Sequence, residues 1–162
     1  MPRDYSFLPC PKCGARLNGQ AGGAMRSLWK CVGCGGIRNM GAVYWGSMAL
    51  ERTPLGGFRV KVDNMELSPE PSQALVNHSP NGFNWGYGGS GPAQLALALL
   101  LDSVGEQQAL ELYHQFKEEV VAQLPSEFYL SRQEIVKWVK AQVRVWQGTF
   151  PVSSQYAEGK GE

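Results

Sequence analysis

Four cysteines near the amino terminus constrain this chain more than any other feature of its sequence. They form two C-x2-C pairs, Cys10 with Cys13 and Cys31 with Cys34, separated by seventeen residues. Two residues between paired thiolates allow one tight turn to aim both sulfurs at a single ion, and the glycine after each pair gives that turn a permissive backbone. The spacing is typical of a zinc site. Since four thiolates close a tetrahedral shell without room for water or substrate, we expect one structural Zn²⁺.

Two disulfides or two redox-active pairs are the alternatives for these cysteines. No secretory signal precedes them and no βαβ pattern surrounds either pair, which argues against both alternatives. The paired cysteines resemble those of the zinc ribbons, and this resemblance implies a small antiparallel β structure around the metal. We expect the ribbon to occupy residues 1–41, with a loop near residues 19–24 and a strand near 27–30. Trp29 in that strand is expected to pack over the metal core rather than to stack on a base.

The charge of the chain is divided unevenly. Its net charge is only +1, but residues 1–41 hold six basic side chains and one acidic one, whereas residues 42–162 hold nine basic and thirteen acidic ones. Such asymmetry indicates a basic module that meets a polyanion, although a module with little core also needs a polar surface. The expected nucleic-acid contacts are five basic residues of the ribbon: Lys12, Arg16, Arg26, Lys30 and Arg38.

The pattern changes after the ribbon, and residues 42–147 are predicted to form a compact α+β domain. Residues 43–52 and 58–62 are rich in strand formers and flank a Thr-Pro-Leu-Gly-Gly turn, which predicts a β-hairpin. Residues 68–72 contain two prolines and are predicted to form a loop. The whole chain is therefore expected to be α+β, with a zinc ribbon joined to a small sheet packed on helices.

Three helices are predicted, over residues 92–102, 106–124 and 131–146. The first is apolar nearly all round and should lie at the centre of the core, and the second is amphipathic. Ser131 and Glu134 form a capping box at the start of the third, which is expected to turn Val143 inward. Residues 148–162 have no periodicity and are expected to form a flexible tail.

A glycine-rich loop precedes the first of these helices and is the second concentrated signal. Its amides and the positive end of the helix dipole suit a phosphate or another anion. The candidate anion- or partner-binding residues are Trp85, Gly86, Tyr87, Gly88, Gly89, Ser90 and Gly91. Trp85 and Tyr87 are the candidates for stacking on a base. The alternative is packing, because the strand and the downstream acid of a dinucleotide fingerprint are missing.

This loop belongs to the run Asn-His-Ser-Pro-Asn-Gly-Phe-Asn-Trp-Gly-Tyr-Gly-Gly-Ser-Gly-Pro, residues 77–92, followed by an alanine- and leucine-rich helix. From about Tyr44 to Trp138 the chain resembles an uncharacterised family of small bacterial and phage proteins that carries this signature. The resemblance implies a fold and a genomic setting, not a catalytic assignment. The setting is that of accessory proteins of phages or mobile elements, which include regulators and inhibitors of host defence systems.

Other constellations of polar residues are thinner. His78 and Ser79 are adjacent, and neighbours in sequence rarely have the geometry for one to activate the other. Lys137, Lys140 and Arg144 form a basic stripe on the last predicted helix. Such a stripe suits a phosphate backbone, but the solvated face of an amphipathic helix has the same pattern.

The sequence thus predicts a non-catalytic protein, located in the cytoplasm of the bacterial host, that binds nucleic acid or a nucleic-acid-handling protein complex. In the setting given above, it would be a regulator or inhibitor of a host defence system that acts by occupying a site. Two other functions remain open: a nucleotide- or anion-binding protein or small enzyme that uses the glycine loop, and a protein–protein adaptor with structural zinc. No membrane partner is expected, because the longest apolar run, residues 95–101, is far too short for a span.

Overall fold

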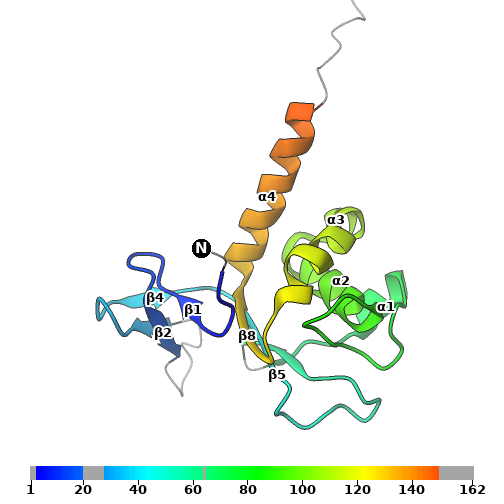
Figure 1. Cartoon of the computed structure of the whole chain (residues 1–162), viewed down its shortest axis with the longest axis horizontal. Coiled ribbons are helices and arrows are strands. Elements are labelled where there is room, and N and C mark those ends of the chain that lie inside the picture. Colours follow the sequence, from blue (N-terminus) through cyan, green and yellow to red (C-terminus); the bar gives the residue numbers. More distant parts are fainter. Residues whose placement is uncertain (1–2, 20–27, 64, 150–162) are drawn as a thin grey trace, which may run out of the picture.

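The computed structural model describes residues 3–19, 28–63 and 65–149. These residues form two four-stranded antiparallel sheets and four α-helices (Figure 1). The predicted α+β class is therefore confirmed.

The first sheet contains the four cysteines at its turns. Its strands follow one another in the order β1-β2-β3-β4. Their bounds are β1 Leu8–Pro9, β2 Arg16–Gly19, β3 Leu28–Cys31 and β4 Ile37–Asn39. We refer to these four strands with their turns as the ribbon. The loop expected near residues 19–24 and the candidate contact Arg26 lie outside the described residues, except for Gly19 at the end of β2.

The second sheet has the order β7-β6-β5-β8. Its strands are β5 Val43–Ser47, β6 Val60–Val62, β7 Met65–Glu66 and β8 Glu127–Ser131. The predicted hairpin is confirmed by the pairing of β5 with β6. Strand β8 was not predicted. Its inward-facing apolar residues are only Phe128 and Leu130, and so short an alternation of apolar and polar residues gives little evidence of a strand in the sequence.

The helices are α1 Glu70–Leu75, α2 Ser90–Val104, α3 Glu106–Glu119 and α4 Arg132–Thr149, with a 3-10 turn at Val121–Gln123. The prediction of a loop over residues 68–72 was wrong for residues 70–72. Helix α1 begins there because Pro71 occupies its first turn, where the missing N–H of a proline costs no hydrogen bond. The prediction of three helices therefore missed one.

Two predicted helix ends also differ. Helix α3 ends at Glu119 instead of residue 124, and the Gly86 N–H donates to the Val121 carbonyl at 3.1 Å, in the 3-10 turn that follows. Helix α4 continues to Thr149, so residues 148 and 149 do not belong to a tail, and residues 150–162 are not described. Val143 of α4 is 38% exposed, so its predicted inward orientation is wrong.

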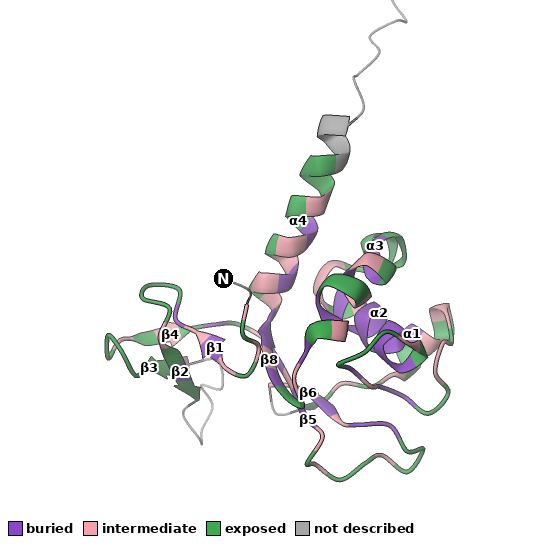
Figure 2. Cartoon of the chain, viewed as in Figure 1, coloured by how far each residue is buried: buried purple, intermediate pink, exposed green. Residues whose placement is uncertain are grey.

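The main core is built around α2. Every residue from Gly91 to Leu100 is buried, as predicted for a central helix (Figure 2). Strands β5, β6 and β8 and helices α3 and α4 supply further residues of this core, and the 3-10 turn and the connecting loops supply the others, among them Phe58, Phe83 and Trp85. Among the described helices, none combines the length and apolar character needed to cross a bilayer.

Helix α4 connects the two parts of the molecule. It follows β8 directly, and in Figure 1 it rises between the ribbon and the helices α1 to α3, with its carboxyl-terminal half extending beyond both. The capping box predicted at its start is present: the Ser131 N–H donates to Glu134 Oε2 at 2.9 Å, and the Glu134 N–H donates to Ser131 Oγ at 3.2 Å.

Candidate metal centre

The four cysteine sulfurs come together at one end of the ribbon. All four lie within 4.8 Å of one another. The Sγ–Sγ distance is 4.0 Å between Cys10 and Cys34 and 3.4 Å between Cys13 and Cys31, and a tetrahedral Zn²⁺ with 2.3 Å bonds would set such distances at about 3.8 Å. The cysteines are free thiols rather than disulfides. This cluster can therefore hold a metal ion.

Two matching turns bring the sulfurs together. The Gly14 N–H donates to the Cys10 carbonyl at 2.8 Å, and the Gly35 N–H donates to the Cys31 carbonyl at 3.1 Å. Both glycines have positive φ, +73° and +68°, a conformation that residues with a Cβ adopt only under strain. The glycine that follows each cysteine pair thus closes its turn, as the sequence predicted.

Two backbone amides form hydrogen bonds to one of the cysteine sulfurs. The N–H groups of Gly33 and Cys34 point at Cys31 Sγ, at 3.3 and 3.4 Å. The hydrogen bond from the Cys34 amide lowers the pKa of the Cys31 thiol. Since the thiolate is the form that ligates a metal, this geometry favours coordination.

The half-buried Arg38 side chain reaches the sulfurs. Its guanidinium donates to Cys34 Sγ at 3.3 Å. Arg38 pairs with Trp29 on β3, and residues two apart on a strand share a face, so it lies on the same face of the sheet as Cys31. Its charge would offset that of the thiolates, as outer-shell groups do at metal sites, and its contact with nucleic acid stays a prediction.

The opposite face of the ribbon sheet carries exposed basic residues. Lys30 pairs with Asn18 on one side and with Ile37 on the other, and all three are exposed. Arg16, two residues before Asn18, shares this face and is also exposed. Lys12 lies exposed in the first cysteine turn. We call Arg16, Asn18, Lys30 and Ile37 the outer face.

The exposed cations of the ribbon take no part in the ion pairs found among the described residues. These ion pairs involve Arg3, Arg59 and Arg132 as their basic partners. Three of the five candidate nucleic-acid contacts, Lys12, Arg16 and Lys30, are thus exposed and make no ion pair with another described residue.

The ribbon shares a small core with the second sheet. Leu8, Leu17 and Met40 pack with two of the cysteines and with Val43 of β5, and Trp29 and Tyr129 cover this cluster. The rings of Trp29 and Tyr129 meet edge to face with centroids 6.5 Å apart. Trp29 therefore packs beside the cysteine cluster, as the sequence predicted.

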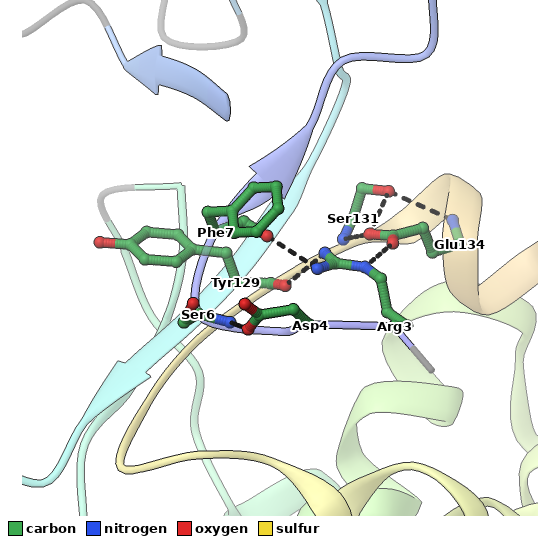
Figure 3. Close-up of polar contacts among 7 residues, drawn as sticks. All are labelled: Arg3, Asp4, Ser6, Phe7, Tyr129, Ser131 and Glu134. Carbon is green, nitrogen blue, oxygen red and sulfur yellow. Dashed lines mark hydrogen bonds and ion pairs between the residues drawn. The ribbon is translucent and has the colours of Figure 1, made fainter. Parts of the chain in front are cut away.

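Arg3 fastens the start of the chain to the base of α4 (Figure 3). Its Nε donates to Glu134 Oε1 at 2.7 Å, and its two terminal nitrogens donate to the carbonyls of Phe7 and Tyr129 at 2.8 and 3.1 Å. The same Glu134 carboxylate forms the capping box with Ser131. One guanidinium thus joins the segment leading into the ribbon to β8 and α4.

Trp85 of the glycine loop is part of the core. It is 1% exposed, and its ring packs against Phe58 and Phe128 while its Nε1 donates to the Pro125 carbonyl at 2.8 Å. The expectation that Trp85 stacks on a base is therefore wrong. Tyr87, by contrast, is 48% exposed.

Packing explains two glycines of the motif in this loop. A Cβ on Gly91 would lie 2.6 Å from the Asn84 Cβ, and Gly86 has a φ of +84°. A Cβ on Gly88 would meet nothing within 4 Å. Helix α2 begins at Ser90, and its N-cap residue Gly89 offers no side chain for capping.

A buried glutamine holds the segment before the loop and was not singled out from the sequence. Gln94 is fully buried in α2, and its Oε1 accepts the N–H groups of His78 and Ser79 at 2.8 and 3.2 Å. His78 Nε2 lies 2.9 Å from the Tyr113 hydroxyl. No sequence pattern marks this arrangement, because it joins three segments far apart in the chain.

The chain belongs to a family of unknown function, DUF6166, which matches residues 48–141. The match covers more than half of the chain and includes the glycine loop, whereas the four cysteines precede it. Neither the curated proteins nor the solved structures gave a match.

Proposed function

We propose that this protein is a non-catalytic binding protein whose ribbon, held by one Zn²⁺, docks on nucleic acid. The observation that carries the proposal is the outer face, where Arg16 and Lys30 are exposed beside polar side chains. Lys12 adds a third exposed cation in the neighbouring turn. Asp4, the single acid of residues 1–41, is instead engaged with the Ser6 amide.

The donor set supports Zn²⁺ as the ion. Four thiolates are typical of structural zinc, and they leave no open position at which the metal could activate water. A ribbon with so few buried residues also needs such a staple, because small modules rarely bury enough apolar surface to fold alone. The metal would therefore fix the shape of the outer face without taking part in a reaction.

The contact would be made with phosphates rather than with bases. None of the four residues of the outer face is aromatic, so the face itself offers no ring for stacking on a base. Phe7, Trp29 and Tyr129 line a hollow next to Arg16 and Asn18, but Trp29 and Tyr129 pack against each other there. Exposed cations that neutralise phosphates give binding that weakens steeply with salt and carries little sequence information.

The resemblance to phage and bacterial accessory proteins supports a setting for this activity. We propose that binding serves to occupy a nucleic acid or a nucleic-acid-handling complex of the bacterial host. A regulator or an inhibitor of host defence would act in this way, without catalysis of its own.

The test is neutralisation of the three cations. The variant Lys12→Gln/Arg16→Gln/Lys30→Gln should bind a duplex oligonucleotide much more weakly than the unmodified protein does. The slope of the logarithm of the binding constant against the logarithm of the salt concentration should become less steep by about 2.7, because three phosphate contacts are removed. The matched control is Lys137→Gln/Lys140→Gln/Arg144→Gln, which removes three cations from α4. Equal retention by the ribbon variant and the unmodified protein would exclude the outer face.

A further inference from the structure

A groove runs between the end of the ribbon and one face of α4. Its volume is about 660 Å³, and one wall is the connection from β4 to β5. The lining residues are Met40, Gly41, Ala42, Arg132, Gln133, Val136, Lys137, Lys140, Ala141 and Arg144. Seven of these belong to α4.

The residues that α4 gives to the groove form one straight stripe. From Gln133 to Arg144 they recur at spacings of three and four, which places them on a single face of the helix. At a rise of 1.5 Å per residue the stripe is about 17 Å long. Three turns of another helix could lie along it.

The groove is lined by apolar residues, which we call its floor, and by three basic residues, which we call its rim. Val136 and Ala141 alternate along the stripe with Lys137, Lys140 and Arg144, and no acidic residue lines the groove. Among the described residues, the ion pairs leave these three cations without an acidic partner. The stripe therefore offers both apolar contact and unneutralised positive charge.

The two walls are held in place before any partner arrives. The Arg132 N–H donates to the Ala42 carbonyl at 2.9 Å, and the Arg132 side chain pairs with Asp102 at 2.8 Å. Arg3 fixes the same end of α4 through Glu134. A preformed groove loses little conformational entropy on binding.

We propose that this groove binds an acidic amphipathic helix of a partner protein. Apolar side chains of that helix would lie on the floor, and its carboxylates would meet the basic rim, as in helix-in-groove recognition. The proposal goes beyond nucleic-acid binding, because it gives the protein a second surface for a different kind of partner.

Two other occupants fit the groove less well. A nucleic acid is one of them: the lining contains no aromatic side chain for stacking on bases, and an apolar floor makes no favourable contact with a hydrated phosphate backbone. A second copy that packed the same stripe against this one would bring like charges together, which costs free energy.

The test uses three 15-residue helical peptides with the same leucine stripe but with glutamate, glutamine or lysine beside it. Fluorescence anisotropy should show that the glutamate peptide binds at least tenfold more tightly than the glutamine peptide. The lysine peptide should not bind. Failure of the glutamate peptide to bind would overturn the proposal.

Charge reversal on α4 should create binding to a different peptide, a result that a misfolded protein would not give. The variant Lys137→Glu/Lys140→Glu/Arg144→Glu should bind the glutamate peptide at least tenfold more weakly. It should also bind the lysine peptide, which the unmodified protein does not bind, as expected when complementary charges set specificity. The ribbon variant Lys12→Gln/Arg16→Gln/Lys30→Gln should bind the glutamate peptide normally, so each surface can fail independently of the other. Unchanged binding by the reversed variant would contradict the proposal.

Three further results would assign the groove to another occupant and overturn the proposal. One is an oligonucleotide whose binding depends on the α4 cations while the glutamate peptide does not bind. Another is a dimer, seen by light scattering, that the charge reversal dissociates. The third is binding of the glutamate peptide only by a variant that ends at Thr149, which would assign the groove to residues 150–162. We expect to observe none of these three results.

Discussion

The ribbon and the domain that follows it bury very different amounts of apolar surface. The ribbon's cluster has six buried residues, two of which are cysteines of the metal centre and one of which, Val43, comes from the second sheet. The domain instead buries ten consecutive residues of α2 beneath two other helices and a sheet. With the proposed Zn²⁺, one chain would thus contain a region that a bound ion holds in shape and a region that keeps its shape by burial. A binding surface on the first should depend on metal, whereas one on the second should not.

Removal of the metal tests this difference with the largest expected effect. The variant Cys31→Ser, or treatment with a chelator, should unfold the ribbon, because structural zinc supplies about 10–16 kcal/mol of apparent binding free energy in comparable modules. Hydrogen exchange should show lost protection in β2 to β4 and retained protection in α2. The control Val32→Ser changes an exposed neighbour of the same turn and should have no effect. Equal loss of protection in both regions would show that they fold as one unit.

Truncation of Trp85 tests whether the glycine loop belongs to the core. Because the ring is buried and packed on two phenylalanines, Trp85→Ala should lower the free energy of unfolding by about 3–5 kcal/mol. Tyr87→Ala, at an exposed position of the same loop, should change it by less than about 0.5 kcal/mol. Chemical denaturation measures both values. Similar small effects at the two positions would mean that Trp85 is available to a ligand.

A pair of glycine substitutions separates packing from ligand binding in the same loop. Gly91→Ala would place a Cβ 2.6 Å from that of Asn84, and overpacking of this kind costs about 1–3 kcal/mol. Gly88→Ala meets open space and should be nearly neutral in thermal melts. Should Gly91→Ala prove as stable as Gly88→Ala, the packing explanation for Gly91 would fail.

The capping box links the domain to α4 and should have a smaller effect. Ser131→Ala removes the acceptor of the Glu134 N–H, and loss of such a cap costs about 1 kcal/mol. Ser131→Thr keeps the hydroxyl and serves as the control in urea titrations. Equal destabilisation by the two variants would point to packing at this buried site rather than to capping.

The smallest effect concerns pH. Burial, together with the charges of His114 and Lys117, lowers the pKa of His78. The unfolded chain therefore takes up this proton at a higher pH than the folded chain does, and stability should fall as the pH drops below about 6.5 and level off below the folded pKa. His78→Gln removes the titrating group and should flatten that part of the pH profile. An unchanged slope in this variant would assign the dependence to other groups.

The features that could be predicted from the sequence are those set by local chemistry. The two cysteine turns, the capping box and the central helix α2 each follow from residues close together in the chain. Helix α1 was missed because two prolines suggested a loop, yet one of them lies in a first turn, where proline is tolerated. Strand β8 was missed because its pairing with β5 joins residues eighty or more positions apart.

The binding surfaces were predicted only in part for the same reason. The sequence identified the cations of the ribbon, but the strand register decides which face each occupies, and it turns Arg38 toward the sulfurs and Lys30 away from them. The basic stripe on α4 was visible in the sequence, whereas the groove was not, because its other wall comes from residues 40–42.

Native mass spectrometry tests the central claim most directly, namely that a metal ion held by four thiolates gives the ribbon its shape. The expected result is a chain whose mass includes one Zn²⁺ and whose cysteines are all reduced. A metal-free chain, or one whose mass is lower by the four hydrogens lost in two disulfides, would contradict the account.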